Sequence, residues 1–465
     1  MFGKGKNRIA HFFNTTAQNR MEFVKLLLWD WPGEIRRLIV DDVNGNPINF
    51  EIENDSLGEM IEYCGHTYLR IFIDVTVPAY GYATYVIRED AAGLIKNVIH
   101  TDMRTHSSTE YVFENDKIKV TFDKFSFFII SIIDKATGHG MIGQGGAGFR
   151  LIDEDTNEGM SSWIVGRYNA ITDLHRNVRL IDYKLNYNYS WLEYEIKFRS
   201  SDMKVKVSLK KGSSMLEFDV TCGWQEIGKQ DKSIPQLNFS THLNYECEKY
   251  KYDIPFGTID RVQQDMDMPA NSWAMGISES GPAIMAVTRT KNAYRGYRNH
   301  LNMTLIRGSF YPDAFPEVYS HQFKFALAVV NSAMSNAELI AYSDILVHPI
   351  FSMLGTFHEG TLPLTHGFIK LLKGNVTISA IKKPEQGDGM IIRIYESEGQ
   401  VQEVAIEFDL TVESAWIVDL NETIMQPLPN CTNSANKDSL NTTTKTLNFT
   451  TDPYKVTTIH IVLDS

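Results

Sequence analysis

The sequence has 465 residues, enough for about three domains and more than one hydrophobic core. Its 57 acidic residues outnumber its 45 basic ones, and the formal net charge of −12 argues against a nucleic-acid-binding protein. An apolar content of 43% and an aromatic content of 11% exclude a largely disordered chain. The longest nearly apolar run, Phe125 to Ile133, is far short of the roughly twenty residues that a membrane helix needs.

The N-terminus and the cysteines bear on the cellular compartment. Residues 1–20 include basic side chains but no apolar segment, so we expect no signal peptide. The 4 cysteines are scattered and lack the spacing of a metal site. They are typical of reduced core residues and not of a disulfide framework. These features favour a cytoplasmic protein.

Alternation of apolar and polar residues dominates the middle of the chain. It is clearest over residues 117–123, 192–198, 203–209 and 216–222. A period of two residues predicts antiparallel strands that turn one face to a core and the other to water. We therefore expect a β-meander from about residue 180 to residue 224. No strand–helix–strand rhythm is present, which argues against a parallel α/β sheet.

One helix is predicted towards the C-terminus. Ser335 and Glu338 have the spacing of a capping box, and Leu339, Ile340 and Ile345 continue an apolar stripe. The proline that follows His348 ends the predicted helix.

Strand patterns return after the helix. They cover Val376–Ile381, Met390–Tyr395, Val404–Leu410 and Val456–Leu463, and the polar stretch from Asn430 to Lys445 is predicted to be a surface loop. A second polar segment, around Arg104–Ser108, separates two earlier strand patterns. The expected domains are therefore residues 1–108, 109–352 and 353–465.

Residue patterns that could carry chemistry are few. His100-Thr101-Asp102 has a spacing that can place two metal ligands together, but a solvated linker histidine is the favoured alternative. The glycine-rich stretch Gly143–Gly148 precedes no helix pattern, so we expect a flexible turn and not a phosphate-binding loop. Asp153-Glu154-Asp155 forms an acidic cluster, yet sequence cannot pair its carboxylates with others. The residues by themselves indicate no catalytic set.

Tryptophan side chains are the remaining candidates for ligand contact. Trp29, Trp31, Trp163 and Trp191 could stack on sugar rings, or they could be core residues of β-sandwiches. Trp163 is the strongest candidate for ligand contact, because glycine and serine surround it.

Several short segments are informative when taken in order along the chain. They are Arg8–Arg20, Val77–Tyr82, Phe113–Asp123, Ser131–Gly138, Leu305–Ser309, His321–Phe323, Lys383-Pro384 and Arg393–Glu396. In order and spacing they resemble the C-terminal β-domain portion of glycoside hydrolase family 38, the zinc-dependent α-mannosidases, in a bacterial-like form. The resemblance extends over nearly the whole chain.

The resemblance implies an all-β fold. It predicts a large antiparallel β super-sandwich, galactose-mutarotase-like, flanked by two smaller β-sandwich domains, with one short helix. In the family, an N-terminal β/α barrel and a helical bundle come first, and the barrel carries the zinc ligands and the aspartate nucleophile. The match begins after both, so no position here inherits either role, and we expect no cofactor in this chain and zinc only in the complete enzyme.

The implied activity is retaining hydrolysis of α-mannosides, with this chain packing on the barrel and completing the carbohydrate cleft. By itself the chain is expected to be inactive. Four residues are the predicted substrate contacts at the cleft-facing edge: Phe149, Trp163, Arg307 and His321. Phe149 ends Gly146-Ala147-Gly148-Phe149, a loose match to a family segment that places an aromatic ring at the substrate. Arg307 could instead be an ion-paired strand residue, and His321 a hydrogen-bonded core histidine.

Two other functions remain open. The chain could be a structural or oligomerisation module, with an exposed apolar surface that leads to self-association. It could also be a carbohydrate-binding, lectin-like module with exposed aromatic residues on a β face. The expected partners are the barrel and helical bundle, an α-mannoside and, in the case of a homo-oligomer, a second copy; nucleic acid and membrane are not expected.

Overall fold

The computed structural model describes residues 7–53, 60–90, 110–157, 159–356, 359–428 and 444–464. In these ranges the regular secondary structure is almost entirely antiparallel β-strand, with a single α-helix, α1 (Asn336–Val347). It forms two compact units, Met1–His100 with Ser335–Ser465, and Thr101–Met334. The all-β prediction is confirmed. None of the helical segments in the described ranges has the length and apolar character that crossing a bilayer requires.

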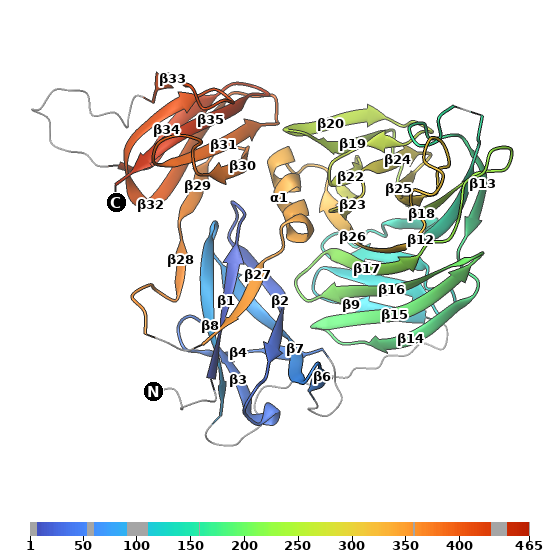
Figure 1. Cartoon of the computed structure of the whole chain (residues 1–465), viewed down its shortest axis with the longest axis horizontal. Helices are drawn as coiled ribbons and strands as arrows, with labels where there is room; N and C mark the ends of the chain where they lie inside the picture. Colours follow the sequence, from blue (N-terminus) through green and yellow to red (C-terminus); the bar gives the residue numbers. More distant parts are fainter. Residues whose placement is uncertain are drawn as a thin grey trace, which may run out of the picture. The chain divides into compact units, whose positions relative to one another are not determined.

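The unit Thr101–Met334 contains two sheets, each of nine described strands. One has the order β21 (Met268–Pro269), β24 (Ala293–Tyr297), β25 (His300–Arg307), β18 (Ile234–Leu243), β12 (Ile142–Glu154), β11 (Ile129–Asp134), β10 (Ile118–Asp123), β9 (Glu110–Glu114), with β13 (Tyr168–Asp173) on β12. The other has the order β14 (Val178–Lys184), β15 (Tyr189–Phe198), β16 (Ser201–Lys210), β17 (Met215–Gly223), β26 (Ser320–Asn331), β23 (Pro282–Thr288), β22 (Trp273–Gly276), β19 (Lys249–Ile254), β20 (Gly257–Val262). Figure 1 shows the two sheets as the green, cyan and yellow part of the chain.

Side chains from both sheets form one core. Phe149 of β12 lies edge-on to Phe218 of β17, with ring centroids 6.4 Å apart. Phe218 stacks on Phe325 of β26 at 4.5 Å. Aromatic rings from facing sheets therefore interlock, as in a sandwich about 10 Å thick. This is the predicted large super-sandwich.

The alternating segments form the predicted strands β10, β15, β16 and β17, and their apolar positions are buried. The prediction for Gly143–Gly148 was wrong: these residues belong to β12. A Cβ atom on Gly148 would lie 2.5 Å from the Phe128 ring, and one on Gly145 would lie 2.7 Å from His242 Nδ1. Glycine is needed here because other side chains lie directly over the strand.

The other unit contains three sheets in the described residues. The first has the order β27 (Phe351–Gly355), β1 (Asn7–Asn14), β8 (Gly81–Glu89), β3 (Leu38–Asp41), β4 (Pro47–Ile48), with β28 (Thr365–Gly367) on β8. The second has β2 (Arg20–Trp29), β7 (His66–Val77) and β5 (Phe50–Ile52), with β6 (Ile61–Tyr63) on β7. The third has β29 (Ile369–Lys373), β32 (Gln402–Val418), β35 (Val456–Leu463), β31 (Met390–Glu396), β30 (Val376–Lys382), with β33 (Ile424–Pro427) and β34 (Thr444–Thr451) on β32.

The first two of these sheets enclose one hydrophobic core, and the third has a core of its own. Strand β27 pairs with β1, so residues far apart in sequence share a sheet. The boundaries 1–108, 109–352 and 353–465 stay a prediction, and Arg104–Ser108 lies outside the described residues. The expected C-terminal strands are present, with β32 longer than predicted. The polar segment 430–445 lies mostly outside the described residues.

The predicted helix and its capping box are confirmed. The Glu338 backbone amide donates to Ser335 Oγ at 3.2 Å, and the Ser335 amide donates to Glu338 Oε2 at 2.8 Å. The apolar stripe differs in one position, because Leu346 and not Ile345 joins Leu339 and Ile340 among the buried residues.

Candidate functional site

An ion pair with a fully buried carboxylate and a largely buried guanidinium lies where β12 and β25 end. Glu154, the last residue of β12, has 0% of its surface exposed. Arg307, the last residue of β25, donates from Nε to Glu154 Oε1 at 2.8 Å and from Nη2 to Oε2 at 2.8 Å. Gln236 of the intervening strand β18 donates to Oε1 at 3.0 Å. A bidentate pair with such additional bonds is strong, and losing either partner leaves a buried charge.

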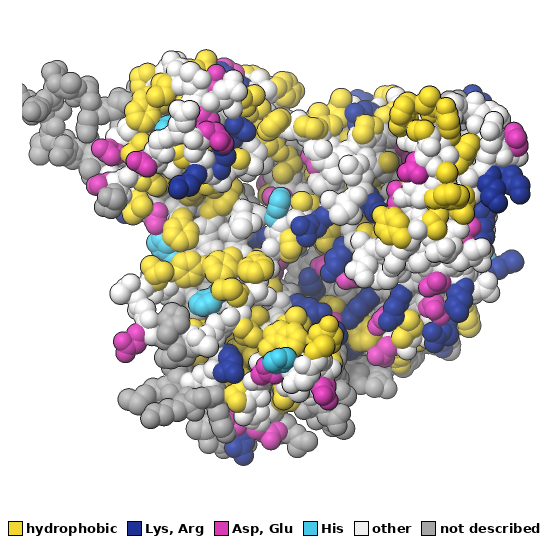
Figure 2. Space-filling view, in the orientation of Figure 1, with side chains coloured by type: hydrophobic (Ala, Val, Ile, Leu, Met, Phe, Trp, Pro, Cys, Tyr) yellow, Lys and Arg dark blue, Asp and Glu magenta, His cyan; other side chains and the backbone are white. Residues whose placement is uncertain are grey.

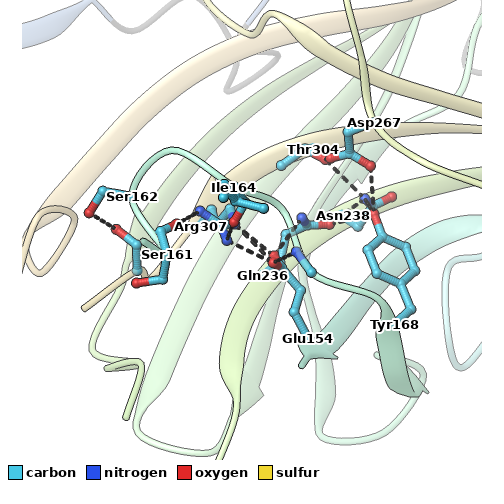
Figure 3. A network of polar contacts seen from close by, with 12 residues as sticks. Glu154, Ser161, Ser162, Ile164, Tyr168, Gln236, Asn238, Asp267, Thr304 and Arg307 are labelled. Carbon is cyan, nitrogen blue, oxygen red and sulfur yellow. Dashed lines mark hydrogen bonds and ion pairs between the residues drawn. The ribbon is translucent and has the colours of Figure 1, made fainter. Parts of the chain in front are cut away.

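The same ion pair holds the segment after β12. Arg307 donates from Nη2 to the carbonyl of Ile164 at 2.7 Å and from Nη1 to the carbonyl of Ser161. The Gly166 amide donates to Glu154 Oε2 at 3.0 Å. Figure 3 shows the guanidinium between the carboxylate and these two carbonyls. The loop at residues 159–167 is therefore fixed to the sheet at several points.

A second loop, residues 308–319 between β25 and β26, is bonded to the first. Ser161 Oγ accepts from the amides of Phe310 and Tyr311 at 3.0 and 2.9 Å. The Ser162 amide donates to the Tyr311 carbonyl at 2.8 Å. We call residues 159–167 and 308–319 the loop pair.

The loop pair presents large apolar side chains to solvent. Trp163 is 73% exposed. The other exposed apolar side chains of the loop pair are Met160, Ile164, Val165, Tyr311, Phe315 and Tyr319. Large exposed apolar side chains on a well-fixed backbone are typical of an interaction surface.

A second polar cluster lies beside the ion pair. Asp267 accepts from Arg295 Nε at 2.8 Å and from Thr304 Oγ1 at 2.7 Å, and its Oδ1 is 3.1 Å from the Tyr168 hydroxyl. The guanidinium carbon of Arg295 lies 3.5 Å from the centroid of the Tyr168 ring. Burial raises the pKa of the Tyr168 phenol well above its ordinary value, so the phenol remains a hydrogen-bond donor.

These two clusters have the geometry of structural ion pairs. Glu154 and Asp267 each accept three or more bonds from neighbouring donors. A carboxylate with its lone pairs occupied in this way is poorly suited to exchange protons with a substrate. The arrangement can position the loop pair, and we assign it that role.

The four predicted substrate contacts have different environments. Trp163 lies on the loop pair. Arg307 is an ion-paired strand residue, the alternative that the sequence left open, and it is bonded to the backbone of the first loop. His321 follows the second loop, stacks on Tyr319 at 4.1 Å and has Nε2 2.7 Å from the Glu317 carbonyl oxygen. Phe149 is only 2% exposed and lies in the core, which favours a packing role. Substrate contact by any of the four stays a prediction.

Sequence reasoning missed most of the polar network. Glu154 was noticed only as part of an acidic cluster, while Gln236, Asp267 and Arg295 carried no local signal. Their partners are far apart in sequence, and only strand order brings them together.

Metal ligands are a separate question. Within the described ranges, no three His, Cys, Asp or Glu side chains are grouped so that they could hold a metal ion. His100-Thr101-Asp102 lies outside those ranges. We therefore derive no step through zinc from the described residues.

Comparison with known proteins gives two matches to family models. The C-terminal domain of glycosyl hydrolases family 38 matches residues 113–315, and the family 38 C-terminal beta sandwich domain matches residues 375–459. Together they cover more than half of the chain. The chain belongs to glycosyl hydrolase family 38. Within that family, it carries the C-terminal β domains.

Curated relatives and solved structures agree with this assignment. Alpha-mannosidase G of Dictyostelium discoideum is 22% identical over 201 residues, 40% of this chain and 17% of that protein. Alpha-mannosidase 2C1 of Homo sapiens is 22% identical over 235 residues, 48% of this chain and 22% of that protein. The matches thus span about a fifth of the relatives' length.

Two structures from Enterococcus faecalis share the fold. A family 38 protein has a TM-score of 0.72 at 15% identity, covering 98% of this chain and 58% of its own. An alpha-mannosidase of strain V583 has a TM-score of 0.72 at 14% identity, covering 99% of this chain and 56% of its own.

Proposed function

We propose that this chain is the β-domain part of an α-mannosidase, a retaining glycoside hydrolase, and that it acts together with an N-terminal catalytic barrel. The supporting observation is the asymmetry of the structural match. Nearly all of this chain aligns with family 38 structures, while just over half of each of those chains is covered. The uncovered part of those chains is long enough for a catalytic barrel and a helical bundle.

The loop pair is the part of this chain that we assign to the barrel-facing edge. Its backbone is held by the Glu154–Arg307 ion pair, so its aromatic side chains need little further ordering when a partner binds. Trp163 is exposed and lies on a fixed loop, which suits a ring that stacks on a sugar. Arg307 and His321 would act by holding the two loops, and Phe149 by filling the core of the sandwich.

Hydrolysis of an aryl α-mannoside tests this function. The chain by itself should show no turnover above buffer, with or without added zinc. The same chain combined with an N-terminal family 38 catalytic barrel and helical bundle should hydrolyse the substrate. Turnover by the chain alone that disappears on chelation would show that catalytic residues lie within it. Absence of turnover in the combined protein would refute the proposed function.

A structural or oligomerisation module is the second candidate. The exposed aromatic residues of the loop pair would serve a second copy as well as a barrel. Analytical ultracentrifugation separates the two functions. Self-association that Trp163→Ala abolishes, without any mannosidase activity in the combined protein, would favour the oligomerisation module.

A further inference from the structure

An open groove with a volume of about 760 Å³ lies in the unit that contains β2 and β27. Both are edge strands of their sheets, and Ser352 Oγ donates to the Lys25 carbonyl at 3.2 Å across them. The groove is lined by Lys25, Leu26, Leu27, Trp29, Tyr63, Tyr68, Arg70, Ser352, Met353 and Leu354. Figure 2 shows hydrophobic side chains gathered over this part of the chain, with basic side chains nearby. The size is within the range of small-ligand sites, roughly 300–1,000 Å³.

The outward face of the β2–β7 pair supplies one wall. Leu26 and Leu28 of β2 point into the core, so the alternate residues Leu27 and Trp29 point outward. Trp29 pairs across the strands with Tyr68. Large apolar and aromatic side chains thus occupy outward positions, which are usually polar in a sheet that turns one face to water.

The aromatic rings are partly exposed and inclined to one another. The Trp29 and Tyr68 centroids are 4.8 Å apart, with ring planes at 46°. Trp29 is 36% exposed, and Tyr63, at the end of β6, is 62% exposed. Rings with free faces at different angles suit a ligand that presents several small apolar patches, and not one flat surface.

Hydrogen-bond donors are fixed beside these rings. The Arg70 guanidinium carbon lies 5.4 Å from the Tyr68 centroid, and Nη2 donates to the Tyr68 hydroxyl at 3.2 Å. The Lys25 ammonium lies 2.9 Å from Glu53 Oε2, and Arg70 Nε lies 3.8 Å from the same oxygen. Glu53 is 1% exposed. A buried carboxylate therefore anchors two partly exposed cations beside the rings.

We propose that this groove binds a neutral sugar ring of an oligosaccharide. A hexose has apolar C–H faces that suit the Trp29 and Tyr63 rings, and hydroxyl oxygens that accept from Arg70 and Lys25. A purely apolar partner would strip water from the two cations without replacing their hydrogen bonds. The identity of the sugar as an α-mannoside rests on the proposed function, whereas the binding step does not.

Calorimetric titration of the 465-residue chain with an α-linked mannotriose tests this groove. We expect weak, saturable binding in the millimolar range. Trp29→Ala should weaken it by roughly tenfold, the upper end of what one aromatic contact contributes. Arg70→Met keeps the apolar stem but removes the donors, and it should weaken binding severalfold. Phe125→Ala is the matched control, because it removes an exposed aromatic ring of the other unit that has no part in either proposed site, and it should leave the affinity unchanged.

Thermal unfolding of each variant shows whether folding is retained, and Trp29→Phe replaces Trp29→Ala if the latter does not fold. The proposal is overturned if the unmodified chain does not bind millimolar sugar, or if Trp29 and Arg70 variants bind as the unmodified chain does. Loss of self-association in Trp29→Ala, with no sugar binding, would assign the groove to a second copy instead. Because no catalysis is measured, failure here leaves the mannosidase proposal standing, and failure of the mannosidase assay leaves this result intact.

Discussion

The strand pairs β15–β16 and β2–β7 have the same inward pattern but different outward faces. Both bury alternate apolar residues in a core. On the outward face of β15–β16, Glu193 lies opposite Lys206 and forms an ion pair with Lys204 at 2.6 Å. On β2–β7, the outward face carries Leu27, Trp29 and Tyr68 together with the basic residues Lys25 and Arg70. The apolar residues of the inward face are required by the hydrophobic core. The residue types of the outward face indicate whether the strand pair faces water or a ligand.

Phe149 and Trp163 extend the comparison to single residues of one sandwich. Phe149 packs edge-on against Phe239 at 5.0 Å and against Phe325 at 6.0 Å. Trp163 lies a short distance further along the chain and faces solvent. The same predicted role, substrate contact, thus falls on one buried residue and one exposed one.

The largest expected effect is loss of stability on Phe149→Ala. Removing a ring from a packed aromatic cluster leaves a cavity and should lower the free energy of unfolding by about 3–5 kcal/mol. Trp163→Ala should change it by no more than about 0.5 kcal/mol, because little of that side chain is buried. Denaturant unfolding of both variants measures this difference. Equal losses would mean that Trp163 is a core residue, contrary to its exposure.

The next effect concerns the ion pair that fixes the loop pair. Glu154→Ala leaves the Arg307 guanidinium without its carboxylate and should cost about 3 kcal/mol. Glu193→Ala, which removes a partly exposed pair on β15, should cost less than about 1 kcal/mol. Hydrogen–deuterium exchange of the backbone amides at residues 159–167, among them the Gly166 amide that donates to Glu154, should also become faster in Glu154→Ala. Unchanged stability and exchange would remove the ion pair from our account of the loop pair.

The smallest effect is a pH dependence at His300 in β25. Its ring stacks on His242 at 4.5 Å, and burial, together with that neighbour, lowers the pKa of His300 to about 4. Between that value and the ordinary 6.5, the unfolded chain binds a proton that the folded chain does not. Stability should therefore fall as pH drops through this window.

His300→Gln removes the titrating ring and should flatten that dependence, measured as the difference in Tm between pH 7 and pH 4 relative to the unmodified chain. The nearby charges of Arg150 and Asp173 are present in both proteins, so they cancel in the comparison. An identical pH profile in the two proteins would contradict the lowered pKa.

Sequence predicted strands well where side chains alternate and poorly where they do not. The segments at β10 and β15–β17 carry their burial pattern in their own residues, so local reasoning was enough. Gly143–Gly148 has no alternating side chains, and its strand character depends on Phe128 and His242 lying over it. Phe149 was taken from a family segment, although its alternation with Gly148 and Arg150 would have placed it inward.

The candidate sites were predictable only in part. An exposed tryptophan among glycine and serine was recognisable at Trp163, because its neighbours give no apolar pattern. The partners of Glu154 come from β18 and β25, and the groove brings β2 next to β27. Such pairings depend on strand order, which the alternating pattern does not specify.

Hydroxyl-radical footprinting tests most directly whether exposed apolar side chains on the outward faces form binding surfaces for a partner or a ligand. It reads side-chain exposure in the chain alone and in the chain combined with the proposed catalytic barrel. Our account predicts that Trp163, Tyr311 and Phe315 are labelled in the chain alone and protected in the combined protein, while Trp29 keeps its labelling rate because the sugar groove stays open. Unchanged labelling of the loop pair, together with protection of Trp29, would contradict it.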